Sequence, residues 1–269
     1  MDLIATPDLV GRAAQIASAY TQSRMRVLER LEGNPLGIEI RIIDGAAVAL
    51  IARDLPSPFF NSVLGLRAEH EALLPSLAAW YRESGASGRF VIEPAAFTPA
   101  LGRALAKAGQ APVGFHAILI GAPGASAPNS PGVAIERVAT ADAMEAYLDA
   151  YVAGWSIPDA QRAGFKDNVR GWLAEPGWAL YLARVDGHPA AAATLYLRED
   201  GAYCADAATV PEYRRCGLQT ALLARRIADA GAAGAAFVCS GADYLSGSHR
   251  NMERAGLRLL SLRTIWTAA

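Results

Sequence analysis

The sequence predicts an α+β protein made of two similar units. The chain has 269 residues, and a change of composition at residues 121–132 (GAPGASAPNSPG) divides it into two parts of similar length. Pro, Gly, Ser and Asn replace the hydrophobic patterns there, which is typical of a linker. Both parts predict strands, a helix, a strand, a short helix and a final strand in the same order. We therefore expect two domains, 1–122 and 133–269, each with a mixed, mostly antiparallel sheet and flanking helices.

The first part opens with a helix predicted over residues 6–31, because Thr6 is a suitable N-cap and Pro7 fits the first helical position. Strands GIEIRII and AVALIAR follow, and SVLGL is a candidate third strand. Next come a helix that Pro75 interrupts early (HEALLPSLAAWYRESG), the strand RFVIEP, the helix TPALGRALAKAG and the strand VGFHAILIG. The end of its short helix, LAKAG, matches MERAG in the second part.

The second part predicts a strand at 133–140 and helices at 141–155 and 159–175. A meander of the strands WALYLARV, PAAAATLYL and AYCADAATV follows, with a first turn at Asp186-Gly187. The helix GLQTALLARRIADAG comes next, then the strand AAFVCSGA, the short helix SHRNMERAG and a last strand pair in LRLLSLRTIWTAA. In the long helix an apolar face is expected opposite a polar one: Leu223, Ala224, Ile227 and Ala228 against Arg225, Arg226 and Asp229.

Composition excludes several classes of protein. Lys+Arg 25 against Asp+Glu 26 gives a formal net charge of -1, so a basic field for nucleic acid would have to be local. No apolar run reaches the ~18 residues that a membrane span needs, and the start of the chain lacks the order of a signal peptide, so we expect a cytoplasmic protein. Cys204, Cys216 and Cys239 are too few for a disulfide framework or a zinc site, and no metal is expected.

The chemistry is concentrated in TVPEYRRCGLQTALL, residues 209–223, between a strand and a helix that leads to another strand. A right-handed crossover makes these two strands parallel and puts the loop at a strand's carboxyl end. There the first helical N–H groups lack partners and the helix dipole favours an anion. Gly217 allows close approach of the backbone, and Arg214 and Arg215 add charge, so the loop suits a pyrophosphate.

This segment resembles motif A of the GNAT superfamily of N-acetyltransferases, whose consensus is Q/R-x-x-G-x-G/A. Arg214, Gly217 and Gln219 fall on its fixed positions, although Gln219 replaces the usual small residue. The resemblance implies a GNAT fold over 133–269, acetyl-coenzyme A as co-substrate and an amine as acceptor. The coenzyme-binding residues that it implies are Ala208, Thr209, Val210, Arg214, Arg215, Cys216, Gly217, Leu218, Gln219, Thr220, Ser248 and Asn251.

Two other readings of the basic residues stay open at this point. Arg214 and Arg215 could form a solvated helix start, because basic pairs are common on surfaces. A nucleic-acid surface could combine them with Arg225 and Arg226, but no aromatic residues interleave with these arginines and the chain is near neutral. We expect no nucleic-acid partner and no membrane partner.

The segment GADYLSGSHRNMERAGLRLL resembles GNAT motif B. Ser248 falls on the motif's Ser, but Met252 occupies the position of a Tyr that commonly protonates the departing thiolate in the family. Ser248, Ser246, Tyr244 or a water could replace it, or the thiolate could leave unassisted, since a thiol pKa of ~8.5 makes a tolerable leaving group. Ser246 and Ser248 are equally suited to helix capping.

The attacking amine must be neutral, so a base or a proton-conducting water chain is needed. Asp206 is the only carboxylate on the strand AYCADAATV and is the candidate base, with a structural role as the alternative. The resemblance also implies that this strand splays from AAFVCSGA, so that backbone groups at 207–210 bind pantetheine and polarise the acetyl carbonyl. In this family, residues between the first strand and the meander usually determine which acceptor binds. Here that segment contains Tyr147, Tyr151, Trp155, Asp167, Asn168 and Trp172. Packing between helices is the alternative role for these residues.

The first part resembles a GNAT fold in its element order only. It lacks a phosphate loop, and Glu69 near its helix start would repel phosphate, so it is expected to bind no coenzyme A. Phe59, Phe60 and Asn61 either close the acceptor pocket or pack between domains. The sequence thus predicts an acetyl-coenzyme A-dependent N-acetyltransferase, with a non-catalytic acyl-coenzyme A sensor or interaction protein as the alternative. The acceptor and the oligomeric state stay open, a homodimer included.

Overall fold

The computed structural model describes residues 4–55, 58–124, 132–199 and 201–269. Contacts between Cα atoms divide it into two compact units, which we describe separately. The N-terminal unit consists of Ala5–Ile118, Ala242–Tyr244 and Leu260–Ala269, and the C-terminal unit of the described residues within Leu119–Gly241 and Leu245–Leu259, together with Ile4. Most of the linker predicted at 121–132 lies outside the described residues, and the domain boundaries at 122 and 133 stay a prediction.

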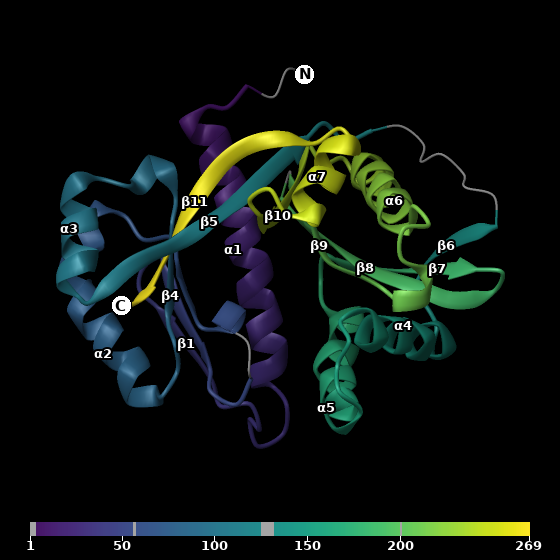
Figure 1. Ribbon diagram of the computed structural model, residues 1–269, viewed down its shortest axis with the longest axis horizontal. Coiled ribbons are helices and arrows are strands. Elements are labelled where there is room, and N and C mark those ends of the chain that lie inside the picture. Colours follow the sequence, from purple (N-terminus) through teal and green to yellow (C-terminus); the bar gives the residue numbers. More distant parts are fainter. Residues whose placement is uncertain (1–3, 56–57, 125–131, 200) are drawn as a thin grey trace. The chain divides into compact units, whose positions relative to one another are not determined.

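The N-terminal unit contains its helices and strands in the predicted order (Figure 1). They are α1 (Pro7–Glu29), β1 (Ile38–Ile42), β2 (Val48–Ala52), β3 (Ser62–Leu64), α2 (Leu74–Ser84), β4 (Arg89–Ile92), α3 (Pro99–Lys107), most of β5 (Gln110–Gly121) and most of β11 (Arg258–Ala268). Short 3-10 helices lie at Pro58–Phe60, Ala68–Leu73 and Pro94–Ala96. The candidate third strand, SVLGL, is therefore confirmed as β3.

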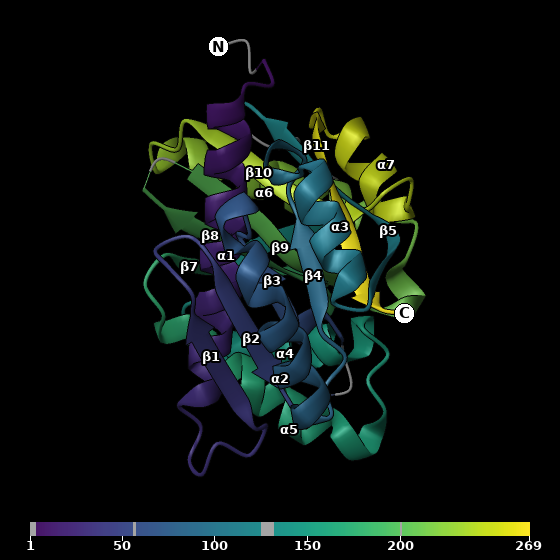
Figure 2. The same ribbon diagram turned by 90° about the vertical axis from the view of Figure 1, so that its left-hand side faces the viewer.

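The sheet of this unit has the strand order β1-β2-β3-β4-β11-β5. β3 and β4 are parallel, whereas β1 with β2, β2 with β3, and β4 with β11 are antiparallel. Helix α1 covers one face and α2 and α3 the other, as the two views in Figure 1 and Figure 2 show. The sheet is therefore mixed and mostly antiparallel, as predicted.

The first helix begins where the sequence places it. The Thr6 side chain accepts a hydrogen bond of 3.2 Å from the Leu9 N–H, and Pro7 takes the first helical position, where its missing N–H leaves no bond unmade. Thr98 caps α3 in the same way, accepting from the Leu101 N–H at 3.0 Å. The helix predicted around Pro75 starts only at Leu74, because a 3-10 helix occupies the preceding residues.

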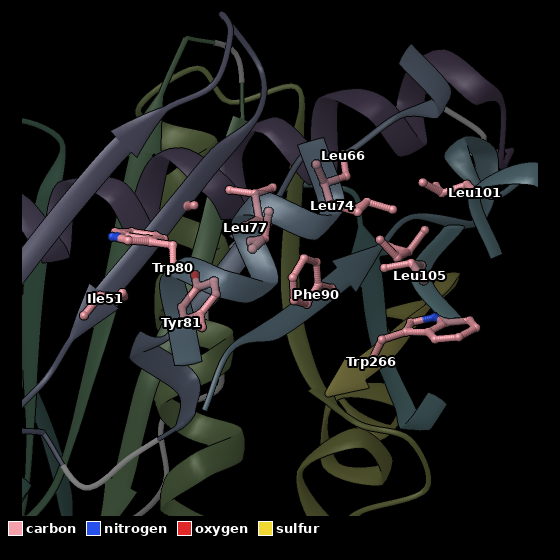
Figure 3. Packing of buried hydrophobic residues seen from close by; sticks show 13 residues of the cluster. Ile51, Leu66, Leu74, Leu77, Trp80, Tyr81, Phe90, Leu101, Leu105 and Trp266 are labelled. Carbon is pink, nitrogen blue, oxygen red and sulfur yellow. The ribbon is translucent and has the colours of Figure 1, made fainter. Parts of the chain in front are cut away.

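The core between the sheet and helices α2 and α3 is apolar and aromatic (Figure 3). Leu74, Leu77 and Trp80 of α2, Leu105 of α3, Phe90 of β4 and Trp266 of β11 belong to one cluster of buried side chains, in which Trp80 and Trp266 lie at opposite ends. Burying side chains of this size contributes about 1.5–3 kcal/mol each, which is why this face holds the unit together.

Phe60 and Asn61 belong to the interior of the N-terminal unit. Phe60 is 7% exposed and packs against the cluster on the α1 face, and the Asn61 amide oxygen accepts a hydrogen bond of 2.8 Å from the Ala52 N–H. Phe59 is 38% exposed. Packing within this unit therefore accounts for two of the three residues singled out in this loop.

The C-terminal segment corrects one prediction. The expected strand pair in LRLLSLRTIWTAA is a single strand, β11, without a turn. It pairs antiparallel with β4, so that Thr264 lies opposite Ile92 and Trp266 opposite Phe90. The end of the chain thus completes the sheet of the N-terminal unit. A pattern of alternating side chains predicts a strand but carries no information on a partner so distant in sequence.

The C-terminal unit also follows the predicted order. Its elements are β6 (Val133–Arg137), α4 (Ala141–Gly154), α5 (Asp159–Arg170), β7 (Trp178–Val185), β8 (His188–Arg198), β9 (Gly201–Thr209), α6 (Leu218–Ala232), β10 (Phe237–Asp243) and α7 (Gly247–Arg254). The strand order is β10-β9-β8-β7-β6, antiparallel except for the parallel pair of β9 and β10. The mixed, mostly antiparallel α+β fold class is confirmed for both units.

Helices cover both faces of this sheet. Figure 1 shows α6 on one side of β7 and β8, and α4 and α5 on the other. The turn between β7 and β8 lies at Asp186-Gly187 as predicted, and both residues have positive φ, 47° and 83°, which a tight hairpin of this type requires. None of the described helices has both the length and the hydropathy needed to cross a membrane.

Candidate functional site

The strand β9 changes its pairing partway along. Its parallel register with β10 runs from Gly201 opposite Phe237 to Cys204 opposite Ser240, whereas its antiparallel register with β8 continues to Thr209. The β8 register shifts there, and Asp206 has φ +47°. An extra residue in one strand with a left-handed φ is a β-bulge, which bends the strand and redirects its backbone. The splay predicted for this strand begins at this bulge.

The helix that follows begins without a side-chain cap. Gly217 occupies the N-cap with φ +76°, and a Cβ placed on it would meet no atom within 4 Å. No side chain therefore caps the start of α6, and the dipole of a 15-residue helix adds partial positive charge at the same point. Such a helix start favours an anion.

A cavity of about 430 Å³ opens at this helix start. All the residues that line it belong to the C-terminal unit. They are Gly154, Trp155, Ala207, Ala208, Thr209, Tyr213, Arg214, Arg215, Gly217, Leu218, Gln219, Thr220, Gly247, Ser248, Asn251 and Arg254. The end of β9, the loop, and the starts of α6 and α7 therefore meet at one cavity. These are the segments from which the expected coenzyme-binding residues come.

Most of the predicted site residues line this cavity, and four do not. Val210, Cys216, Asp206 and Tyr244 are absent from its lining. Asp206 lies in the bulge and is partly buried. Tyr244 is 41% exposed, groups with the N-terminal unit, and donates its backbone N–H to the Phe115 carbonyl at 3.3 Å.

The Arg214 guanidinium is held by backbone carbonyls. Its Nε donates to the Thr209 oxygen at 3.3 Å and its Nη2 to the Gly154 oxygen at 3.1 Å. The side chain thus ties the loop to the end of β9 and to the last turn of α4, while its charge stays beside the cavity.

Gln219 stands where motif A usually has a small residue, and its longer side chain reaches a hydrogen-bond partner. Its amide Nε2 donates to the Thr209 hydroxyl at 2.7 Å. The side chain therefore crosses to the strand end, and the helix start beside Gly217 keeps its open space.

The sequence reasoning missed several residues at the cavity, above all Gly154. A Cβ on Gly154 would lie 2.7 Å from the Ala208 Cβ and 2.8 Å from the Thr209 nitrogen, so only glycine lets α4 approach the strand this closely. Trp155, considered above only as an acceptor-side or packing residue, is 51% exposed and lines the cavity beside it. A glycine in the last turn of a helix followed by an exposed aromatic was the available signal. The other missed residues are Tyr213, Gly247 and Arg254, whereas Ala207 belongs to the backbone segment expected at the coenzyme.

The two serines of motif B have different surroundings at the start of α7. The Ser246 hydroxyl caps the helix, accepting from the His249 N–H at 3.1 Å, whereas Ser248 lines the cavity. Asn251 accepts a hydrogen bond of 3.1 Å from the Thr220 hydroxyl and so joins α7 to α6. The capping role expected for either serine is therefore taken by Ser246.

One arginine of α6 lies elsewhere than expected. Arg226 is 3% exposed, although the predicted helical pattern placed it on the polar face. The buried residues of the helix are Leu218, Ala221, Leu222, Leu223, Arg226 and Ala230. Arg225 donates to Asp229 and to the Ile135 carbonyl. The alternative of a nucleic-acid surface built on both arginines is therefore wrong for Arg226, because its guanidinium has no access to solvent.

In the N-terminal unit the short 3-10 helix Ala68–Leu73, which precedes α2, begins beside carboxylates. The Asp44 Oδ2 lies 2.9 Å from His70 Nε2 and 3.1 Å from Arg67 Nη2, and Arg67 also pairs with Glu69 at 2.7 Å. Backbone N–H groups of Ala46 and Ala47 and the contact with His70 lower the pKa of Asp44 to about 2. Although Asp44, Glu69 and His70 are close enough to hold a metal ion, the Arg67 guanidinium already pairs with both carboxylates.

Comparisons with known proteins agree with this arrangement. Residues 125–247 match the family model described as an acetyltransferase (GNAT) domain. No curated protein sequence matches the chain.

Several solved structures have the same fold over nearly the whole chain. A GCN5-related N-acetyltransferase from Kribbella flavida has 22% identity and a TM-score of 0.68, covering 95% of this chain and 95% of that one. A tandem GNAT protein from the clavulanic acid biosynthesis pathway, solved without acetyl-coenzyme A, has 14% identity and a TM-score of 0.64, covering 99% of this chain and 96% of that one. A GCN5-related N-acetyltransferase from Sphaerobacter thermophilus has 15% identity and a TM-score of 0.62, covering 96% and 90%.

At these identities the structures show the fold alone, and it is the tandem arrangement predicted from the repeated element order. Residues 125–247, which include most of the residues that line the cavity at the start of α6, are thus similar to a GNAT acetyltransferase domain.

Proposed function

We propose that the C-terminal unit transfers an acetyl group from acetyl-coenzyme A to a primary amine. The observation that carries this proposal is the uncapped start of α6 at Gly217, which faces the cavity next to Arg214 and Arg215. A helix start with free N–H groups and adjacent guanidinium groups matches a pyrophosphate in charge and geometry. The open space at Gly217 fits such a group, because no side chain fills it.

The remaining lining suggests where the thioester lies. From the helix start the cavity extends to the backbone of Ala207 and Ala208, beyond the bulge of β9. Backbone N–H groups of this segment would hydrogen-bond the acetyl carbonyl, and they would stabilise the negative charge that develops on its oxygen as the amine attacks. Holding thioester and amine together supplies most of the rate enhancement in such a reaction.

Two proton transfers complete the reaction. The amine loses a proton as its nitrogen bonds to the acetyl carbon, and an ordered water accepts it; because Asp206 does not line the cavity, it would act as the base only through such a water. The coenzyme sulfur leaves with the electron pair of the broken C–S bond, and Ser248, which lines the cavity, is the candidate to donate a proton to it. A thiol pKa of ~8.5 also lets the thiolate leave unassisted. Tyr244 is the weaker candidate, because it does not line the cavity.

A non-catalytic acyl-coenzyme A sensor is the second candidate function. Met252 in place of the usual tyrosine favours it, because methionine has no proton to give. The sensor uses the same cavity and differs only in turnover.

Release of free thiol across a panel of amines distinguishes the two functions. The wild type is compared with an Arg214→Glu/Gly217→Glu variant, which puts two carboxylates at the phosphate position, and with Arg198→Glu, an exposed charge reversal on β8 away from the cavity. An acetyltransferase releases thiol with at least one amine in the wild type and in Arg198→Glu only. Coenzyme binding without turnover on any amine favours the sensor, and no binding of acetyl-coenzyme A by the wild type excludes both.

A further inference from the structure

The cation buried beneath the β9 bulge is Arg226. Its Nη1 donates to the Thr194 carbonyl at 3.0 Å and to the Ala205 carbonyl at 3.1 Å, and its Nε donates to the Leu222 carbonyl at 3.1 Å. Thr194 and Ala205 face each other across β8 and β9, next to the register shift. Arg226 therefore bonds both strands at the point where their regular pairing stops.

The charge of Arg226 has no counter-ion in the part of the chain that the structure describes. None of the ion pairs among these residues includes Arg226, and its contacts are with backbone carbonyls. Removing a guanidinium from water costs several kcal/mol, and carbonyl dipoles offset only part of that cost. Leucine and alanine fill the rest of the buried face of α6, so an apolar side chain would suit this position better for stability alone.

The residues around Arg226 are buried and hydrogen-bonded. Thr194 is fully buried, and its hydroxyl hydrogen-bonds Tyr147 of α4 at 3.2 Å. Burial raises the pKa of the neighbouring Cys204 thiol, whereas the positive charge of Arg226 acts in the opposite direction. The guanidinium is thus bonded to α6, β8 and β9 at once.

The residues directly after the bulge line the cavity. Ala207, Ala208 and Thr209 follow Ala205 by two to four positions and belong to the cavity lining. The direction of their N–H groups depends on the conformation of the bulge. Arg226 hydrogen-bonds the Ala205 carbonyl, at the beginning of this bulge.

We propose that Arg226 is a positioning residue for acyl transfer: it holds the β9 bulge so that the backbone N–H groups beyond it point at the thioester carbonyl, and its uncompensated charge strengthens their effect on the developing oxyanion. This inference rests on the proposed function of the same cavity. A fixed positive charge in a water-poor interior acts over a longer range than one in water, because less solvent screens it.

The test measures polarisation of the carbonyl directly. Isotope-edited infrared spectroscopy of bound acetyl-coenzyme A carrying ¹³C at the acetyl carbonyl reports the C=O stretch, which moves to lower frequency as hydrogen bonds to the oxygen strengthen. The variants are Arg226→Met, which removes charge and donors, Arg226→Gln, which keeps an amide donor, and Arg226→Lys, which keeps the charge. Arg225→Met is the matched control, since Arg225 is the next residue on α6 and bonds Asp229 and Ile135, outside the cavity lining.

We expect the wild type and Arg225→Met to show the same shifted band. Arg226→Met should lose most of the shift and at least about tenfold in kcat, with the dissociation constant of coenzyme A changed by no more than about threefold. Arg226→Lys should lie between the wild type and Arg226→Met. If Arg226→Met does not fold, the comparison of Arg226→Lys with Arg226→Gln decides, and the charged variant should keep more of the shift.

Other results overturn the proposal. A lower melting temperature with an unchanged carbonyl band and unchanged kcat per folded molecule would assign Arg226 a structural role only. Equal bands in Arg226→Lys and Arg226→Gln would do the same. A wild type that binds acetyl-coenzyme A with a shifted band keeps the proposed function intact in these cases, whereas a wild type that does not bind acetyl-coenzyme A overturns the proposed function and this inference together.

Discussion

At the scale of single residues, Thr209 organises the site. Its carbonyl accepts a hydrogen bond from Arg214 and its hydroxyl accepts one from Gln219, so both fixed side chains of the loop converge on the strand end. The consensus motif alone predicts neither contact, because a motif gives residue types and spacing but not the partner that a side chain meets. Gln219 is therefore compatible with a pyrophosphate site for a reason that only the structure supplies.

A double-mutant cycle tests the pair of Gln219 and Thr209. Gln219→Ala and Thr209→Val each remove the same hydrogen bond, so the double variant should lose less stability than the sum of the single ones, by about 1 kcal/mol. Urea unfolding measures these changes in the free energy of unfolding. Strictly additive losses would mean that the two side chains do not interact in solution.

Variants of Ser246 and Ser248 distinguish helix capping from proton transfer. Ser246→Ala should cost about 1 kcal/mol of stability, because the His249 N–H loses its partner, and should leave kcat near the wild-type value. If Ser248 protonates the thiolate, Ser248→Ala should lower kcat by ~10² or more with little loss of stability. Steady-state kinetics and thermal unfolding of both variants check this.

A matched drop in kcat for Ser246→Ala, or unchanged kcat for Ser248→Ala at every pH tested, would remove Ser248 from the proton transfer. Met252→Tyr, which restores the family's usual residue, should be neutral or increase kcat.

At the scale of elements, the sequence is informative where the cause of a structure is local. Thr6 and Thr98 predict two helix starts because the capping side chain and the N–H it satisfies are three residues apart. The burial of Arg226 could not be predicted from local sequence in this way. In an alanine-rich helix the sequence pattern does not fix which residues face the core, and a charged residue is normally exposed. The burial of Arg226 is therefore evident only from the strand carbonyls that it contacts in the structure.

The contact between α4 and β9 depends on the absence of a side chain at Gly154. Gly154→Ala would bring its Cβ to 2.7 Å from the Ala208 Cβ and 2.8 Å from the Thr209 nitrogen, so helix and strand must move apart. We expect weaker binding of acetyl-coenzyme A and a loss of stability of roughly 1–3 kcal/mol. Calorimetric titration and urea unfolding measure the two effects.

Gly164→Ala on α5 is the control, because a Cβ there meets no atom within 4 Å. It should be neutral or stabilise by up to about 1 kcal/mol, since alanine is the better helix former. Equal behaviour of the two variants would contradict the close approach of α4 to β9.

The sheet of the N-terminal unit contains a histidine that should make it sensitive to acid. Burial, with the nearby charges of Arg263 and Arg89, lowers the pKa of His116 from 6.5 to about 3. The unfolded chain therefore binds a proton on this residue between these two values while the folded chain does not. Stability should fall as the pH drops from about 6.5 towards 3.

Urea unfolding at several pH values tests this prediction. His116→Gln should lose less stability on acidification than the wild type, whereas His188→Gln, at an exposed position on β8, should follow the wild type. An acid dependence of His116→Gln identical to that of the wild type would show that this imidazole is not neutral in the folded protein.

At the scale of the whole molecule, the repeated element order predicts two units with the same kind of sheet. The sequence could not predict that β11 pairs with β4, because a strand pattern specifies which side chains share a face and leaves the partner strand open. The place of the loop from Arg214 to Thr220 at the start of α6 could be predicted because it depends on one continuous segment, and its binding of phosphate stays a prediction. The missed lining residues Gly154 and Arg254 come from other elements, which the fold brings to the cavity.

The start of α6 and the start of the 3-10 helix before α2 have different surroundings, and this difference predicts the number of coenzymes that each chain binds. In the C-terminal unit the start of α6 faces a cavity, whereas in the N-terminal unit Asp44 and Glu69 already pair with Arg67. We therefore propose that each chain binds one coenzyme.

Calorimetric titration with acetyl-coenzyme A tests this claim most directly. The wild type is compared with Gly217→Glu and with Gly45→Glu, a loop position of the N-terminal unit where a Cβ meets no atom within 4 Å. We predict one coenzyme per chain, loss of at least about 100-fold in affinity for Gly217→Glu because a carboxylate replaces open space at the pyrophosphate position, and wild-type affinity for Gly45→Glu. Two coenzymes per chain, or binding that survives Gly217→Glu unchanged, would contradict the account.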